Sequence, residues 1–565
     1  LVSLLLVAAF FTNCAKMVLP PEISVTPDPL EMHDDSVEVT ITGKFPEKGL
    51  HKKAIAEITP VIKNQDGSEK ALKPISLQGE KVEDNYQVIS VEGGSFTYND
   101  KVPYEEAMKM SALEIRVTAT KGSKTMSLDP LGVAKGVIAT PALVQLDGRP
   151  IMAKDNFVRI TQETKGADIH FAVQQSNVRG SELRDEDIKL LEEFIEEVKE
   201  NDRREFKGAN ISAYASPDGP QDLNTELSEK RAKSAEKFLQ KEFKKIEEAE
   251  AEGFFSEKST PEDWDGFKSL MQDSEIEDKD LILKVLSMYS DPDVREKEIK
   301  NISKVYTVIA DKVLPQLRRS KMNVKIDIIG YSDEEIKAIV DAKPDSLNVE
   351  ELLYAATLFE DMNKELKIYQ DFVSIYPDDW RGPNNVGYAY MNLNKVADAK
   401  KAFEDAKAIE SGNSIVMNNL AAVAIREGDF ETAKQYLESA AGAGKAVSYN
   451  WGIISVKEAG MKTDDYDYNE AVTYFGSDCS FNAALAKLLA GATDQVAKTI
   501  DCADNKEDAM MYYLKAIAGA RAGDSDLLFN SLRVAIEKDA NLAKEAKNDM
   551  EFHKFFGDDT FKSIV

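Results

Sequence analysis

Residues 224–232 read Asn224-Thr-Glu-Leu-Ser228-Glu-Lys-Arg231-Ala232, and they follow a predicted strand at residues 209–214. Spacings of three and four place one set of side chains on a single helix face, namely Asn224, Leu227, Arg231, Ala235 and Phe238. The face is mostly apolar, yet it carries an arginine, whose planar fork of donors suits a carboxylate. An ordinary amphipathic helix with a solvated arginine is the alternative interpretation. These residues alone leave both interpretations open.

The full run, N-x-x-L-S-x-x-R-A-x-x-A-x-x-F-L, resembles the signature helix of the OmpA C-terminal domain. That module holds peptidoglycan in Gram-negative bacteria, so the resemblance implies an OmpA-like α/β domain, which we place at residues 151–340. In the family, an aspartate after the strand and the arginine together clamp the diaminopimelate of the peptide stem. The aspartate position here is Ser216, which has no charge, and Asp218 lies two residues further on. The resemblance therefore implies a degenerate peptidoglycan site formed by Arg231, Asn224, Ser216 and Asp218.

An acidic stretch at about residues 246–295 interrupts this domain, and its apolar spacing predicts helices. The run from Thr260 to Arg319 resembles Bacteroidota variants of the OmpA domain. Three roles stay open for this insertion: it covers the ligand groove, binds a partner, or fills space without a function.

Residues 346–540 repeat with an offset of 34 residues. Asn384-Asn-Val-Gly-Tyr-Ala-Tyr390 returns as Asn418-Asn-Leu-Ala-Ala-Val-Ala424. The pattern resembles the tetratricopeptide repeat (TPR), which implies a C-terminal α-solenoid with a concave face that binds peptides or protein elements. A helical cap is predicted at residues 541–565. Four residues are candidates for the concave face, although packing or solvation explains each of them equally well: Tyr388, Asn392, Asn419 and Arg426.

The N-terminal sequence predicts an export signal. Residues 1–11 are almost wholly apolar, and Cys14 follows shortly after them. A cysteine at the end of such a run resembles a lipoprotein cleavage site, which gives a signal peptide at residues 1–13, lipidation of Cys14 and a linker at residues 14–24. A plain secretory peptide with an incidental cysteine is the alternative. No acidic cluster follows Cys14, which favours an outer-membrane protein that faces the periplasm.

Residues 25–150 alternate between apolar and polar side chains, as in Val37-Glu-Val39-Thr-Ile41, which predicts a β-sandwich. A hairpin is expected near residues 138–146. Further along the chain, Cys479 precedes one predicted helix and Cys502 follows the next. The two ends meet in an antiparallel helical hairpin, so a disulfide is expected in an oxidising periplasm, with two unpaired thiols as the alternative.

The composition argues against several classes of protein. The formal net charge of −29 makes nucleic acid an improbable partner. The four histidines lie far apart, without the spacing of metal ligands. No motif of a nucleophile with its base, or of a phosphate-binding glycine loop, stands out. We therefore expect no catalytic residues, no metal and no cofactor, although paired carboxylates of a cell-wall hydrolase would leave no motif.

The predicted fold class is a multidomain α+β protein: a β-sandwich, an OmpA-like α/β domain with a helical insertion, and a TPR solenoid. It resembles Bacteroidota-type outer-membrane lipoproteins that join an OmpA-like domain to TPR repeats. The leading functional hypothesis is a non-catalytic periplasmic scaffold that links the outer membrane or peptidoglycan to protein partners through the solenoid. The alternative is an assembly or secretion accessory factor whose OmpA-like domain no longer binds peptidoglycan.

Overall fold

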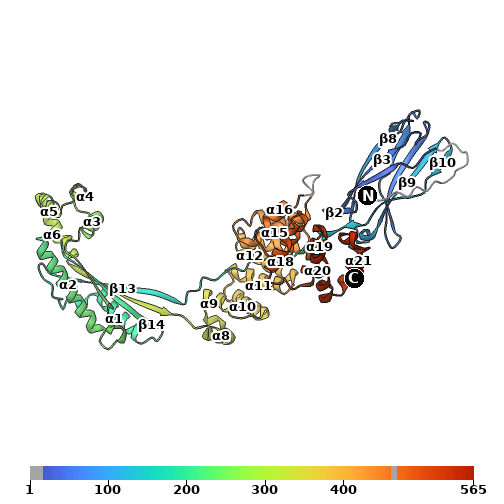
Figure 1. The fold of residues 1–565 in the computed structure, drawn as a ribbon. Coiled ribbons are helices and arrows are strands. Elements are labelled where there is room, and N and C mark those ends of the chain that lie inside the picture. The colour runs from blue at the N-terminus through green and yellow to red at the C-terminus, as the bar shows by residue number, and fades with distance from the viewer. Residues whose placement is uncertain (1–16, 460–466) are drawn as a thin grey trace. The chain divides into compact units, whose positions relative to one another are not determined.

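The computed structural model describes residues 17–459 and 467–565, the side chains of residues 303–305 excepted. The predicted signal peptide and Cys14 lie outside the described residues. The chain forms two compact units, of which one combines residues up to Lys154 with Phe359–Val565 and the other is Asp155–Leu358 (Figure 1). Among the described helices, none has the length and apolar character that a membrane crossing requires.

The N-terminal β-domain consists of two sheets whose inward-facing residues share one hydrophobic core. The first sheet contains β1 (Glu22–Thr26), β2 (Leu30–His33), β3 (Ser36–Phe45), β8 (Gly94–Pro103) and β12 (Val137–Ile138). The second contains β4 (Ile55–Lys63), β5 (Glu69–Ala71), β6 (Ile75–Gly79), β7 (Gln87–Ile89), β9 (Ala112–Lys121), β10 (Lys124–Ser127) and β11 (Leu131–Lys135). Strand β3 buries Val37, Val39 and Ile41, because alternate side chains point to one face.

The end of the β-domain differs from the prediction. No hairpin forms near residues 138–146: β12 is followed by the short 3-10 helix η2 (Thr140–Leu143) and then by an extended stretch. The predicted domain limit at residue 150 is therefore wrong, since residues from Val144 onward pack against the C-terminal helices.

The C-terminal region is a solenoid, as the 34-residue period predicts. After α10 (Met362–Ile375), the described residues form five consecutive helix pairs. The first helices are α11 (Arg381–Asn392), α13 (Ser414–Glu427), α15 (Lys445–Lys457), α17 (Phe481–Leu489) and α19 (Ala509–Ala522). The second helices are α12 (Val396–Ile409), α14 (Phe430–Glu438), α16 (Asn469–Phe475), α18 (Thr493–Asp501) and α20 (Ser525–Lys538). The chain ends with α21 (Asn541–Asn548), the 3-10 helix η6 (Met550–Phe555) and α22 (Asp559–Ile564).

Small residues allow the helices of a pair to approach closely. A Cβ atom at Gly387 would lie 2.5 Å from Cε1 of Phe403, and one at Gly452 would lie 2.7 Å from Cε1 of Phe475. Non-bonded carbon atoms essentially never approach this closely, so a larger residue at either position would force the phenylalanine ring or its helix to shift.

The second unit is an α/β domain around a four-stranded sheet. Its elements follow the chain as β13 (Ile160–His170), α1 (Glu186–Lys199), β14 (Arg204–Tyr214), α2 (Gln221–Glu242), β15 (Phe255–Thr260) and β16 (Arg319–Ile329). The strand order is β13-β16-β14-β15, in which only β14 and β15 run parallel. Two further helices, α8 (Asp333–Ala342) and α9 (Val349–Ala356), complete this unit, so the solenoid unit resumes at residue 359 and not at the predicted 346.

The insertion begins later than the prediction of residues 246–295, because β15 inside that range is a strand of the sheet. The inserted helices are α3 (Trp264–Asp273), α4 (Lys279–Met288), α5 (Pro292–Asn301), α6 (Ser303–Lys312) and α7 (Leu314–Leu317). They form a separate apolar core at one end of the sheet (Figure 1). Strand β15 lies at the edge and is largely exposed, so its polar sequence shows no apolar alternation.

Candidate functional site: an asparagine ladder in the solenoid

Residues 145–153 lie extended along the first helices of four solenoid pairs, and we call them the groove segment. The segment contacts α17 near Gln145 and α11 near Ala153, so it runs antiparallel to the order of the repeats. All of these residues belong to the same compact unit. A polypeptide thus already occupies the surface on which the sequence predicts binding.

Four asparagine amides pair with the main chain of the segment. Each accepts a hydrogen bond from the N–H of one residue and donates one to the C=O of the same residue. Asn482 does so for Gln145 (2.8 and 2.8 Å) and Asn450 for Arg149 (2.7 and 3.1 Å). Asn419 does so for Ile151 (2.6 and 2.8 Å) and Asn385 for Ala153 (2.8 and 2.9 Å).

Two further asparagines connect these pairs into a network. Asn418 donates to the C=O of Arg149 at 3.0 Å, and Asn384 donates to that of Ile151 at 3.2 Å. Asn450 also donates to Asn418 Oδ1 (3.0 Å), and Asn419 to Asn384 Oδ1 (2.9 Å). All six side chains are at most 1% exposed. The six asparagines, which we call the ladder, replace the strand that an extended main chain would otherwise need as a partner.

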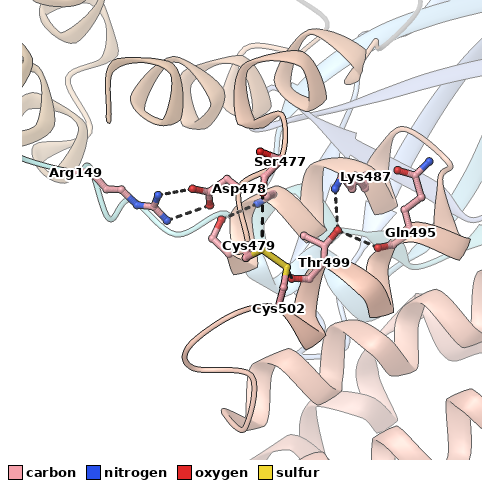
Figure 2. Close-up of a disulfide and its surroundings, with 10 residues drawn as sticks. Arg149, Ser477, Asp478, Cys479, Lys487, Gln495, Thr499 and Cys502 are labelled. Carbon is pink, nitrogen blue, oxygen red and sulfur yellow. Dashed lines mark hydrogen bonds and ion pairs between the residues drawn. A yellow bond between two sulfur atoms is a disulfide. The ribbon is translucent and has the colours of Figure 1, made fainter. Parts of the chain in front are cut away.

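The end of the segment near α17 also has side-chain contacts. The Asp147 carboxylate accepts hydrogen bonds from the hydroxyl of Tyr449 at 2.8 and 2.9 Å and from Nδ2 of Asn482 at 2.9 Å. Arg149 forms a bidentate ion pair with Asp478. The neighbouring Cys479 is joined to Cys502 by a disulfide, which ties the loop that carries Asp478 to the end of α18 (Figure 2).

Burial raises the pKa of Asp147 above its ordinary value, although its hydrogen bonds and Arg149 oppose this. The folded chain then binds a proton more readily than the unfolded chain does. We therefore expect the contribution of Asp147 to the free energy of unfolding to decrease as the pH rises from about 3.9 through the raised pKa. Urea unfolding over this range should show the decrease in the wild-type chain relative to Asp147→Asn; parallel curves for the two proteins would contradict the prediction.

The four candidates for the concave face do not act together. Asn419 belongs to the ladder. Asn392 donates to the C=O of Tyr388 within α11, and Arg426 donates to the C=O of Met391 and to Oδ1 of Asn394. Arg426 therefore links the end of α13 to the end of α11, and these contacts give Asn392 and Arg426 local structural roles.

Five ladder residues were missed by reasoning from the sequence, although a signal for them exists. The dipeptide Asn384-Asn385 returns 34 residues later as Asn418-Asn419, and single asparagines follow at 450 and 482. Polar residues that repeat on the inner helices of a solenoid indicate a polar groove rather than a packing surface.

The candidate peptidoglycan residues lie at the end of β14. Arg231 on α2 is 1% exposed and donates to three main-chain carbonyls, of Tyr214 (2.8 Å), Gln175 (3.1 Å) and Ala172 (3.5 Å). Burial, with a smaller contribution from nearby Arg318, lowers the pKa of Arg231 to about 10. The guanidinium thus joins the loop after β13 to the end of β14 from within the core.

Ser216 and Asp218 form a cluster with a second arginine. Arg318 donates through Nε to the hydroxyl of Ser216 (3.2 Å) and pairs with Asp218 (3.4 Å), while the Ser216 hydroxyl also donates to Asp218. Asn224 donates to the C=O of Gly219 at 3.0 Å. The inserted helices line a small cavity over Pro217 and Asp218, with Trp264, Phe267, Tyr306 and Leu314 among its walls.

No protein-family model and no curated protein matches this chain. Among solved structures, the APC/C hetero-tetramer Cut9-Hcn1 is similar, with 11% identity and a TM-score of 0.31 over 40% of this chain and 46% of that one. PilF from Pseudomonas aeruginosa has 14% identity and a TM-score of 0.29 over 40% of this chain and 98% of its own. A tetratricopeptide repeat protein from Parabacteroides merdae has 14% identity and a TM-score of 0.29, over 39% and 91%. The chain spans less than half of the first of these proteins.

Proposed function

We propose that this chain is a non-catalytic scaffold of the bacterial envelope that is built around a protein-binding solenoid. One observation carries the proposal: the ladder holds the main chain of an extended polypeptide through paired hydrogen bonds at four positions. Main-chain pairing of this kind is how proteins commonly hold extended peptides. The lipid anchor at Cys14, the outer membrane and the periplasm enter the proposal from the N-terminal sequence.

Occupation of the groove by the chain itself changes the role of the solenoid. A tethered segment has an effective concentration in the millimolar range, so a free peptide of similar affinity competes poorly with it. The solenoid then holds its own chain first, and partner proteins bind to its outer faces or to the other domains, or they displace the segment. The scaffold thereby keeps the β-domain joined to the solenoid while the α/β domain carries a separate function.

For the α/β domain, the geometry favours the accessory-factor hypothesis over peptidoglycan binding. Arg231 is buried with all three of its bonds directed to carbonyl groups, and Asp218 is paired with Arg318 beneath the inserted helices. A diaminopimelate group would need Arg231 exposed beside a free carboxylate. We propose that this module contacts other envelope proteins and has lost the wall ligand.

Restoring the family aspartate should not restore wall binding. An aspartate in Ser216→Asp would lie next to Nε of Arg318, pair with it, and stay beneath the inserted helices. We expect neither the wild-type chain nor this variant to sediment with purified peptidoglycan. Sedimentation that free diaminopimelate abolishes would restore the peptidoglycan-binding scaffold as the better hypothesis.

The scaffold itself is tested by isolating the tagged chain from cells. The proposal expects the chain in the membrane fraction, together with envelope proteins that remain bound after mild solubilisation. A chain that stays in the soluble fraction and elutes without any partner would refute the proposal.

A further inference from the structure

The ladder binds mainly the main chain of the segment, yet three consecutive residues of the segment also meet features of the solenoid that depend on their identity. These residues are Asp147, Gly148 and Arg149. If the groove only needed to hold an extended chain, the asparagines would be enough, so the additional contacts indicate sequence selectivity.

Asp147 is recognised by the hydroxyl of Tyr449 and the amide of Asn482, which donate to its carboxylate at 2.8 to 2.9 Å. Both partners are buried. Replacing Asp147 by an apolar residue would remove the acceptor of the buried Tyr449 hydroxyl and one acceptor of the Asn482 amide, and the loss of a partner by a buried donor costs more than the loss of an exposed hydrogen bond.

Gly148 is required by the closeness of α13. A Cβ atom at this position would lie 2.6 Å from the carbonyl oxygen and 2.9 Å from the Cα atom of Ala422. These atoms belong to the backbone of a helix packed on both sides, so they cannot move away as a flexible side chain would. The groove therefore excludes every residue except glycine at this place.

Arg149 is recognised through both its charge and its plane. Its two terminal nitrogens lie 2.6 and 3.1 Å from the carboxylate oxygens of Asp478 (Figure 2). The carbon at the centre of the guanidinium lies 3.4 Å from the centroid of the Tyr449 ring. Lysine cannot make a bidentate bond and stack on a ring at the same time, so the site selects arginine.

We infer that the groove is a selective receptor for an extended polypeptide that carries Asp-Gly-Arg, and that it takes this element from another protein when its own segment is disengaged. The inference rests on the proposed protein-binding role of the solenoid and adds the chemistry of the partner. Tyr449 serves two of the three positions, because its hydroxyl binds Asp147 while its ring supports Arg149.

The test uses two full-length variants and two peptides. In Arg149→Asp, the chain's own segment faces Asp478 with a like charge and disengages, while the groove keeps its wild-type residues. In Asp478→Arg, the groove carries a positive charge where the wild-type groove carries a negative one, so it should prefer an acidic residue at position 149 of the peptide. A fluorescent peptide with the sequence of residues 143–154 and its Arg149→Asp counterpart are titrated into both variants and into the wild-type chain.

We expect the Arg149→Asp chain to bind the wild-type peptide at least about tenfold more tightly than the aspartate peptide, and the Asp478→Arg chain to show the reverse preference. The wild-type chain should bind both peptides weakly, because its own segment fills the groove. Equal binding of the two peptides by both variants would overturn the inference, since the groove would then read only the main chain.

Proteolysis separates this result from a failure of the proposed function. If residues 145–153 of the wild-type chain are cut as fast as an exposed linker, the segment does not lie in the groove, and the protein-binding role fails with it. If the segment is protected but the peptides are not distinguished, only the selectivity is wrong. Should Arg149→Asp fail to fold, Gly148→Val expels the segment by its clash with Ala422 and leaves the groove unchanged, so this chain should show the same preference for the wild-type peptide over the aspartate peptide.

Discussion

Replacing Gly148 by valine is expected to expel the groove segment from the solenoid. The new Cβ atom would overlap the main chain of Ala422 at 2.6 and 2.9 Å, and the helix cannot retreat because its residues are buried against neighbouring helices. The segment has to move instead, which breaks its bonds to the ladder. We expect the docking of the segment in the groove to become less favourable by about 3 kcal/mol. Limited proteolysis, with cleavage sites mapped by mass spectrometry, should show new cuts at residues 145–153.

Gly412→Val is the matched control for this variant. Gly412 lies in the turn before α13, and a Cβ atom there would meet no heavy atom within 4 Å. The control should keep the wild-type resistance of the segment. If Gly148→Val and the wild-type chain resist proteolysis equally, the segment does not approach α13 as closely as the structure has it. The inference that the groove accepts only glycine at position 148 would then be wrong.

The loss of the segment also affects the solenoid. Six asparagine side chains at most 1% exposed would lose their main-chain partners, and buried amides without partners are costly. Water would enter the groove, or the repeats would shift to pair the amides with each other. We therefore expect loss of the segment to destabilise the helices that carry the ladder, and the segment and these helices belong to one compact unit.

The helical half of the fold was predictable because its signal is periodic. The offset of 34 residues between Asn384 and Asn418, and small residues such as Gly387 opposite Phe403, follow directly from packing equal helix pairs. The path of residues 145–153 was not predictable in this way. The segment forms no helix or strand of its own, and its partners lie between 232 and 337 residues further along the chain. A local pattern carries no information about such distant pairing.

In the α/β domain, too, a local sequence pattern predicts some features and not others. The apolar face predicts a helix over residues 224–244, and the observed α2 begins three residues earlier, at Gln221, and ends two residues earlier, at Glu242. Strand β15 could not be inferred from Phe255-Ser-Glu-Lys-Ser-Thr260, because an exposed edge strand needs no apolar alternation. The sequence also does not distinguish an arginine that binds a ligand from one that binds carbonyl groups of its own domain, since both need the same side chain.

Arg231→Ala is expected to destabilise the α/β domain by about 3 kcal/mol. The substitution removes the donors for the carbonyls of Ala172, Gln175 and Tyr214 and leaves a cavity in the core. Part of the loss is offset because a buried charge that is disfavoured, as its lowered pKa of about 10 indicates, is also removed. Hydrogen exchange followed by mass spectrometry should show faster exchange in β14 and in the loop after β13, with the solenoid unchanged.

Lys230→Ala is the control on the same helix. Lys230 is exposed, and among the residues that the structure describes its ammonium group pairs only with Glu226 one turn away, so its loss should change exchange very little. Arg231→Lys tests whether the charge alone is enough. One ammonium group cannot reach both the loop after β13 and the end of β14, so we expect this variant to recover only part of the stability that Arg231→Ala loses. If Arg231→Ala leaves exchange unchanged while it lowers sedimentation with peptidoglycan, Arg231 contacts a ligand and not the core, and the α/β domain is a wall-binding module after all.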